Sequence, residues 1–107
     1  MPYRHLPENK FKLSEQIDIK DNQILSMGIG SFKTSDFRLF SFSKDEEVKQ
    51  EIYPLDTLYI CLEGKLLIEK ENNETLEKDE AIIIKQGVSH KLIALENTKI
   101  LEIKTGD

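Results

Sequence analysis

Turn signals interrupt this sequence every few residues, and their spacing constrains the possible fold more than any other feature. Glu63-Gly64, residues 71–73 and Gln86-Gly87 each separate two apolar runs. The runs are rich in β-branched and aromatic residues, and none keeps a helical periodicity for more than about 11 residues. Because apolar runs lie directly on both sides of Glu63-Gly64, this turn predicts a tight hairpin. The pattern predicts eight or nine short strands, at 23–30, 36–43, 48–53, 57–62, 65–69, 75–76, 81–85, 89–95 and 99–103.

Many short strands in a chain of 107 residues predict one all-β domain, either a sandwich or a barrel. Residues 1–20 form an irregular N-terminal arm, and residues 21–107 form the barrel. Within the arm, Ser14 is a candidate N-cap for a short helical turn over residues 13–19.

Composition limits the expected partners and compartment. Fifteen Lys and Arg residues against twenty Asp and Glu give a net charge of −5, so nucleic acid is not an expected partner. No apolar run approaches the ~20 residues of a membrane helix, so no membrane partner is expected. The first residues lack the apolar segment of a secretory signal, and one cysteine, Cys61, cannot form an internal disulfide. We therefore expect a cytoplasmic protein.

Two blocks of sequence carry a family resemblance. The block SKDEEVKQEIYPLDTLYICLEGKLLI at 43–68 resembles the first cupin motif, and KDEAIIIKQGVSHKLIALENTKILEI at 78–103 resembles the second. The chain is thus similar to the small single-domain cupins of the RmlC-like group. This resemblance implies a cupin jelly-roll barrel, the double-stranded β-helix, and a homodimer. Gly64, Gly87 and His90 match family residues, whereas Asp79, Lys85 and Ala94 replace a glycine, a proline and an asparagine.

The resemblance also implies a degenerate metal site. Cupins that bind a metal use two histidines and a glutamate of the first motif and the histidine of the second. Here Glu51 and Tyr53 stand at the two histidine positions, Thr57 stands at the glutamate position, and only His90 is retained. The leading expectation is that no cofactor is bound. The alternative is a divalent metal (Zn, Ni, Fe or Mn) held by His90 and Glu51.

Strand alternation predicts which side chains face the barrel interior. Phe40 and Phe42 would close its apolar floor, below a pocket for one small molecule. Cys61 is either a buried core residue or a pocket thiol able to bind a soft metal with His90. His5, in the arm, is expected to be exposed, with an inter-subunit ligand role as the alternative. The predicted pocket residues are Glu51, Tyr53, Thr57, Tyr59, Cys61 and His90.

Three functions remain open at this point. The leading interpretation is a module that binds or senses a small molecule. The second is a metal-dependent enzyme, dioxygenase-like or isomerase-like, that uses His90 and Glu51. The third is a metal-free enzyme in which a Glu–His or Tyr–His pair acts as acid and base. A sugar-nucleotide substrate would also need basic residues, for which Arg38 and Lys91 are candidates.

The apolar residues also predict an assembly. Leu58, Ile60 and Leu62 share one strand face, and Leu66 and Ile68 lie nearby in the sequence. Together they exceed what the interior of one small barrel needs. Jelly-roll sheets also have edges, which proteins manage by pairing or covering them. A homodimer interface would bury this surplus.

Overall fold

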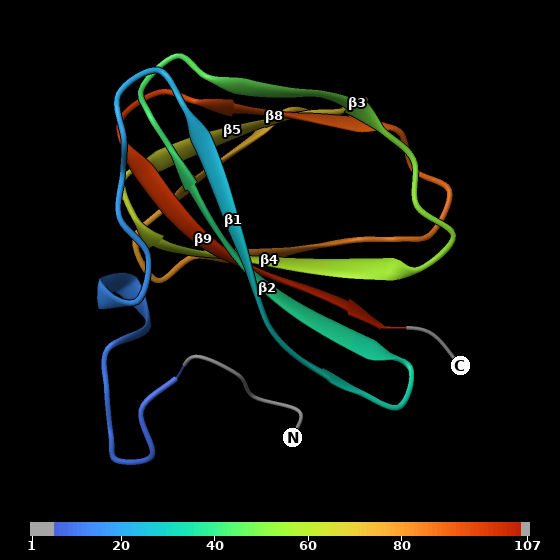
Figure 1. Ribbon diagram of the computed structural model, residues 1–107. Helices are drawn as coiled ribbons and strands as arrows, with labels where there is room; N and C mark the ends of the chain where they lie inside the picture. The colour runs from blue at the N-terminus through green and yellow to red at the C-terminus, as the bar shows by residue number, and fades with distance from the viewer. Residues whose placement is uncertain (1–5, 106–107) are drawn as a thin grey trace.

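The computed structural model describes residues 6–105, and it confirms the all-β prediction (Figure 1). Each predicted strand is present, with bounds that differ by two residues or fewer. Within the described residues the elements are the 3-10 turn η1 (Leu13–Glu15) and the strands β1 (Ile24–Phe32), β2 (Ser35–Phe42), β3 (Glu47–Glu51), β4 (Asp56–Glu63), β5 (Lys65–Glu69), β6 (Glu74–Glu77), β7 (Ala81–Ile84), β8 (His90–Ala94) and β9 (Thr98–Thr105).

The strands form two antiparallel sheets that enclose one interior. The five-stranded sheet has the order β1-β2-β9-β4-β7, and the four-stranded sheet has the order β3-β8-β5-β6. Figure 1 shows β3 and β8 on one side of the barrel and β4 on the other. Strands far apart in the sequence are neighbours in both sheets, as the jelly-roll prediction requires. The loops that follow β3 and β7 meet at one end, where the Gly87 N–H donates to the Tyr53 carbonyl over 2.9 Å.

Gly64 is the only residue between β4 and β5, yet these two strands do not pair with each other. β4 lies between β9 and β7, whereas β5 lies between β8 and β6 in the other sheet. The hairpin prediction at Glu63-Gly64 was therefore wrong. Gly64 has φ +90°, and a Cβ there would lie 2.2 Å from the Asn97 carbonyl oxygen and 2.7 Å from the Thr98 Cα. Only glycine allows the chain to change sheets in so little space.

The inner core lies between the sheets. Tyr59 and Cys61 point inward from β4, as alternation predicts, and Phe42 is fully buried with Phe40 packed against the core. Leu66 and Ile68 are also fully buried in this core. Their assignment to an apolar surplus outside the barrel was wrong, because β5 enters the opposite sheet after Gly64. The buried members are Phe42, Tyr59, Cys61, Leu66, Ile68, Leu76, Ile84, Leu92, Ala94 and Ile100.

A second apolar cluster covers the outer face of the five-stranded sheet. Its buried members are Ile17, Ile29, Leu39 and Leu101. Ile60 and Leu62 pack against them and remain partly exposed, as the alternation along β4 predicts. The remaining partly buried members are Leu6, Leu13, Leu25, Met27, Phe37 and Ile103.

The described part of the N-terminal arm is attached to this outer face. The Lys99 ammonium donates to the Ser14 carbonyl over 2.6 Å, and the Ser41 hydroxyl donates to the Asp18 carbonyl over 2.7 Å. The predicted helical turn is present as η1, but Ser14 is not its cap, because the turn begins one residue earlier and Lys12 holds the cap position. His5 lies outside the described residues. Among residues 6–105, no helix has the length and apolar character needed to cross a membrane.

Candidate functional site

Polar side chains gather at one end of the barrel interior. Thr57 and Tyr59 point inward from β4, and the pairing of β4 with β9 places Lys104 beside Thr57 and Glu102 beside Tyr59. His90 begins β8 in the opposite sheet. Thr57, Tyr59, His90 and Glu102 are each 2% exposed or less. A hydroxyl, a phenol, an imidazole and a carboxyl are thus removed from solvent in one small region, which we call the polar end.

Both ring nitrogens of His90 are engaged. Nδ1 lies 3.0 Å from the Val88 carbonyl oxygen, which can only accept a hydrogen bond, so Nδ1 carries a proton. Nε2 lies 2.8 Å from the Tyr59 hydroxyl. In the neutral ring, Nε2 is the acceptor and Tyr59 donates to it. The structure therefore brings together the Tyr–His pair that the sequence offered as one acid–base possibility.

Two tyrosine rings flank the imidazole. The ring centroids of Tyr53 and Tyr59 lie 5.8 Å and 5.7 Å from that of His90, both in edge arrangements. Burial raises the pKa of each tyrosine hydroxyl, and the negative charge of Glu102 raises both pKa values further. Both phenols consequently keep their protons at neutral pH and remain hydrogen-bond donors.

Glu102 is a buried carboxyl with positive charge on both sides. The Lys104 Nζ lies 3.5 Å from its Oε1, and Arg38 is its pairing partner on β2. Burial raises the pKa of the Glu102 carboxyl, while Lys104 and Arg38 oppose that rise without cancelling it. The Lys104 Nζ also lies 3.7 Å from the centre of the Tyr53 ring, a cation–π contact at the mouth of the barrel.

Two oxygens at the polar end have no hydrogen-bond partner. Within the described part of the chain, Thr57 Oγ1 and Glu102 Oε1 are the buried side-chain polar atoms left without one. Glu102 Oε1 does form an ion pair with the Lys104 ammonium at 3.5 Å, so of these two atoms Thr57 Oγ1 is the one that has neither a hydrogen bond nor an ion pair. Unpaired buried polar atoms are rare in native proteins, so each requires a physical explanation.

Of the other predicted pocket residues, Glu51 lies beside the polar end and Cys61 lies apart from it. Glu51, half-buried, is the backbone pairing partner of His90 across β3 and β8. Cys61 is fully buried in the inner core, with its Sγ 3.5 Å from the Glu63 carbonyl oxygen. Burial raises the pKa of its thiol to about 11, so the thiolate is scarce at neutral pH. The structure therefore places Cys61 apart from the polar end, toward the turn at Gly64.

The donor set does not suit a catalytic metal. Such a site usually has three protein ligands and one open position. Nowhere in residues 6–105 do three His, Cys, Asp or Glu side chains converge on a position that could hold a metal ion. The Nε2 atom of His90, which could ligate a metal, is occupied by the Tyr59 hydroxyl. We therefore derive no chemistry through a metal in this site.

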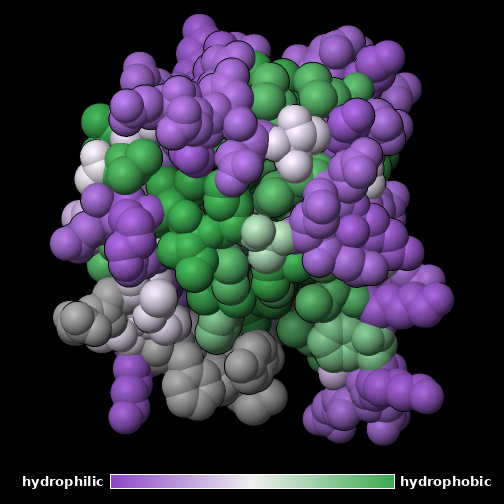
Figure 2. Space-filling model, turned by 180° about the vertical axis from the view of Figure 1, so that it is seen from behind, coloured by the Kyte–Doolittle hydropathy of each residue, from purple (hydrophilic) through white to green (hydrophobic). Residues whose placement is uncertain are grey.

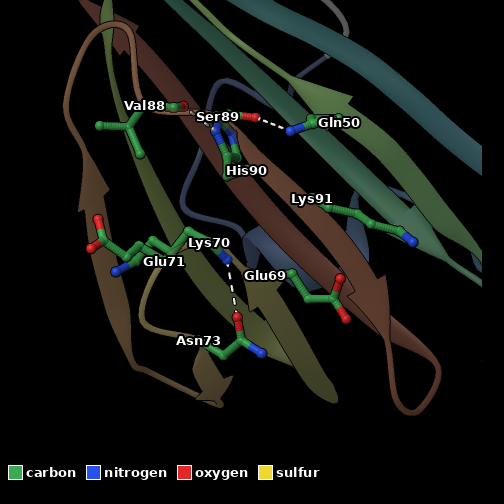
Figure 3. A pocket seen from close by; sticks show the side chains of 9 residues that line it. All are labelled: Gln50, Glu69, Lys70, Glu71, Asn73, Val88, Ser89, His90 and Lys91. Carbon is green, nitrogen blue, oxygen red and sulfur yellow. Dashed lines mark hydrogen bonds between the residues drawn. The ribbon is translucent and has the colours of Figure 1, made fainter.

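An open cleft of about 790 Å³ lies outside the polar end and touches it through His90 (Figure 3). Its walls come from β3, β5, β8 and the turns at 70–73 and 88–89. Charges of both signs line it, from Glu69, Lys70, Glu71 and Lys91. Gln50 is hydrogen-bonded to Ser89 beside the imidazole, as Figure 3 shows. Of the basic residues singled out in the sequence, Lys91 lies in this cleft and Arg38 lies beside Glu102.

Comparisons with known proteins identify the fold. No protein-family model matches the chain. No curated protein matches it either. A solved cupin superfamily protein from Desulfitobacterium hafniense matches over the full length of both chains, with 28% identity and a TM-score of 0.93. The chain is a small cupin domain. The predicted family resemblance is thereby confirmed.

Two further solved structures have the same fold as this cupin. A conserved protein of unknown function from Streptococcus pyogenes is 21% identical, with a TM-score of 0.92 over 100% of this chain and 96% of that one. A cupin 2 conserved barrel domain protein from Leptotrichia buccalis is 24% identical, with a TM-score of 0.90. That match covers 98% of the present cupin and 51% of the Leptotrichia chain. At these identities the likeness shows the fold alone.

The sequence prediction missed two members of the polar end, Glu102 and Lys104. Neither stands at a position of the two cupin motifs that guided the selection of site residues. A signal was nevertheless present, because in the run KILEIK the residues Ile100, Glu102 and Lys104 share one strand face. A carboxyl on the same face as a core isoleucine is a buried charge that requires partners.

Proposed function

We propose that this cupin is a binding or sensing module that holds a small polar molecule at the polar end of its barrel, without a metal. The observation that carries this proposal is the burial of Thr57, Tyr59, His90 and Glu102 together at one end of an otherwise apolar interior. Burying such groups is costly unless they find partners. A ligand that supplies the missing partners would account for their presence.

We expect a ligand to enter the polar end past Lys104, at the mouth of the barrel. Lys104 has a side chain 23% exposed and lies over the half-buried ring of Tyr53. Moving Lys104 aside gives up this contact, worth about 0.5–1 kcal/mol, and also the ion pair with Glu102, so the ligand must supply a new partner for that carboxyl. The Tyr53 and Tyr59 rings would then contact the ligand, and the Tyr59 hydroxyl oxygen, whose proton is donated to His90 Nε2, would accept a hydrogen bond from it.

The test is the melting temperature of the protein with defined sets of compounds: neutral polyols and sugars, sugar acids, amino acids and nucleosides. A ligand at a hundred times its Kd stabilises a folded protein by about 2.7 kcal/mol. At least one set should raise the melting temperature of the wild type, and His90→Gln should abolish that rise. Lys65→Gln, which removes an exposed charge paired with Glu77, is the matched control and should keep it. The proposal fails if no set stabilises the wild type, or if His90→Gln is stabilised equally.

A second candidate function is a metal-dependent enzyme that uses His90 and Glu51. The pairing of these two residues across β3 and β8 favours it. Elemental analysis of untagged protein, before and after incubation with Zn, Ni, Fe or Mn, separates the two candidates. About one metal per chain, lost in His90→Ala, would establish the metal site and overturn the metal-free proposal. No bound metal after incubation would remove the second candidate.

We also propose that the chain forms a homodimer through the outer face of the five-stranded sheet. Ile60 and Leu62 are partly exposed there, in the same apolar cluster as Met27 and Ile103. Seen from behind, the molecule has a broad apolar area bordered by hydrophilic side chains (Figure 2). A two-fold contact between copies would bury such an area with the same residues on both sides. The native mass of the protein tests this proposal.

A further inference from the structure

The two oxygens of the polar end that make no hydrogen bond belong to residues at diagonal positions of one sheet face. Tyr59 is paired with Glu102, and Thr57 with Lys104, so Thr57 and Glu102 lie diagonally across β4 and β9 on the inner face. Diagonal side chains on one sheet face are close enough for one small group to contact both. Thr57 Oγ1 and Glu102 Oε1 are both buried and lack a hydrogen bond.

Thr98 is a second buried threonine, and its hydrogen bonds provide a comparison for Thr57. Thr98 is fully buried. Its hydroxyl has two carbonyl oxygens within donating distance, that of Lys65 at 3.1 Å and that of Glu96 at 2.7 Å. The same oxygen accepts from the Lys65 N–H over 3.1 Å. Thr57 has the same burial and none of these bonds. Its hydroxyl therefore adds no internal hydrogen bond to the folded chain, and its desolvation opposes folding.

We propose that Thr57 Oγ1 and Glu102 Oε1 form a subsite for one hydroxyl group of a neutral bound molecule. This inference rests on the proposed function and adds the chemical class of the ligand. A ligand hydroxyl can donate its proton to the Glu102 carboxylate and accept a hydrogen bond from the Thr57 hydroxyl at the same time. It is thus the simplest group that satisfies both atoms.

The charges around the subsite select against ionic ligand groups. An ammonium group would compete with Lys104 and Arg38, which already supply positive charge to Glu102. A ligand carboxylate would be repelled by Glu102 and by Glu51, both of which act on the tyrosines at this end. A neutral hydroxyl avoids both costs, so we expect the ligand to be an alcohol or polyol at this position.

The first measurement compares two threonine variants of the free protein by thermal unfolding. Thr57→Val should leave the melting temperature unchanged or raise it, because it removes an unpaired buried hydroxyl at constant volume. Thr98→Val should lower the melting temperature by roughly 4 °C or more, because it removes a hydroxyl with several hydrogen bonds. If Thr57→Val loses as much as Thr98→Val, the Thr57 hydroxyl is bonded within the free protein and the proposal is overturned.

The second measurement uses three small compounds: glycerol, serinol, in which an ammonium replaces the central hydroxyl, and glycerate, in which a carboxylate replaces one terminal CH2OH group. Titration is followed by the backbone amide signals of Thr57 and Glu102. Glycerol should give saturable shifts, weakened roughly tenfold or more in Thr57→Val. Tighter binding of serinol or glycerate, an unchanged affinity in Thr57→Val, or no saturable shift with glycerol would each overturn the subsite.

The proposed function can survive that failure. It fails only if none of the broader compound sets stabilises the protein through His90. The hydroxyl subsite is contradicted, and the proposed function kept, if the stabilising compounds are acids or amines, or if their affinity is the same in wild type and Thr57→Val. A water molecule that fills the subsite without being displaced would leave the glycerol titration flat and counts against the subsite.

Discussion

The inner and outer faces of the five-stranded sheet are built from alternate residues of the same strands, yet they bury different chemistry. On β9, Leu101 points to the outer apolar cluster, and its neighbour Glu102 points to the polar end. The outer face gains stability from every side chain it covers. The inner face keeps one carboxyl oxygen and one hydroxyl without a hydrogen bond. The difference teaches that alternate residues of the same strands can form an apolar outer cluster and a polar inner end, and under the proposals above these two regions would serve assembly and ligand binding, respectively.

The largest effect is expected from truncating the outer face. Leu39 is fully buried there, and Leu39→Ala should lower the free energy of unfolding by about 2–5 kcal/mol because it leaves a cavity. Urea denaturation measures the change. Ile83→Ala is the control, since Ile83 is 61% exposed and should change the free energy of unfolding by less than about 0.5 kcal/mol. If both variants lower the free energy of unfolding equally, the close packing of Leu39 in the outer apolar cluster is contradicted.

The next effect concerns assembly on the same face. Leu62→Lys places a charge among the partly exposed apolar residues and should weaken the homodimer roughly tenfold or more, because that charge loses water in the contact. Sedimentation at several concentrations gives the dissociation constant. Thr75→Lys adds the same charge at an exposed position of β6 and should leave it unchanged. If the wild type is a monomer at every concentration, the proposal that the outer face forms a homodimer interface is wrong.

A smaller effect is expected on the inner face from Tyr59→Phe. The variant keeps the ring but leaves the buried His90 Nε2 without its donor at 2.8 Å. The free energy of unfolding should fall by about 1–2 kcal/mol. Chemical denaturation gives that value, and the imidazole nitrogen signals should shift in the same variant. An unchanged stability would mean that the contact contributes little to folding.

The smallest effect is a change in pH dependence from Glu102→Gln. The pKa of Glu102 is raised on folding, so the folded chain binds its proton more readily than the unfolded chain does. The contribution of this group to stability is therefore present at low pH and falls as pH rises above about 4.5, its ordinary value. Glu102→Gln should flatten this fall, which stability curves between acidic and neutral pH would show. A steeper fall in the variant would mean that Lys104 stabilises the carboxylate more than burial opposes it.

Sequence reasoning located the strands from local patterns, and it located Thr57, Tyr59 and His90 of the polar end from the family resemblance together with strand alternation. The two-residue period of a strand places Thr57 and Tyr59 on one face wherever that strand packs. The sheet that a strand joins depends instead on pairing with distant segments. Glu63-Gly64 has the composition of a hairpin, and only the pairing of β5 with β8 shows that the chain crosses to the other sheet there. The misplacement of Leu66 and Ile68 followed from this error.

Glu102 and Lys104 were missed for a related reason. The family motifs direct attention to positions that hold a metal in other cupins, and β9 contributes none of them. The orphaned oxygens became visible only once β4 and β9 were aligned, because hydrogen-bond satisfaction depends on three-dimensional neighbours. A one-dimensional pattern can reveal a buried carboxyl or hydroxyl but not which of their oxygens lacks a hydrogen bond.

The one-residue connection at Gly64 limits where the length of this domain can vary among related proteins. The backbone there has no room even for a methyl group, so a change in this connection would have to displace the backbone of Asn97 and Thr98. The loops after β3 and β7 close the opposite end, beside Tyr53 and His90, and no such connection restrains their length. Insertions and deletions should therefore accumulate around the mouth, where they reshape what the barrel admits while the far end stays fixed.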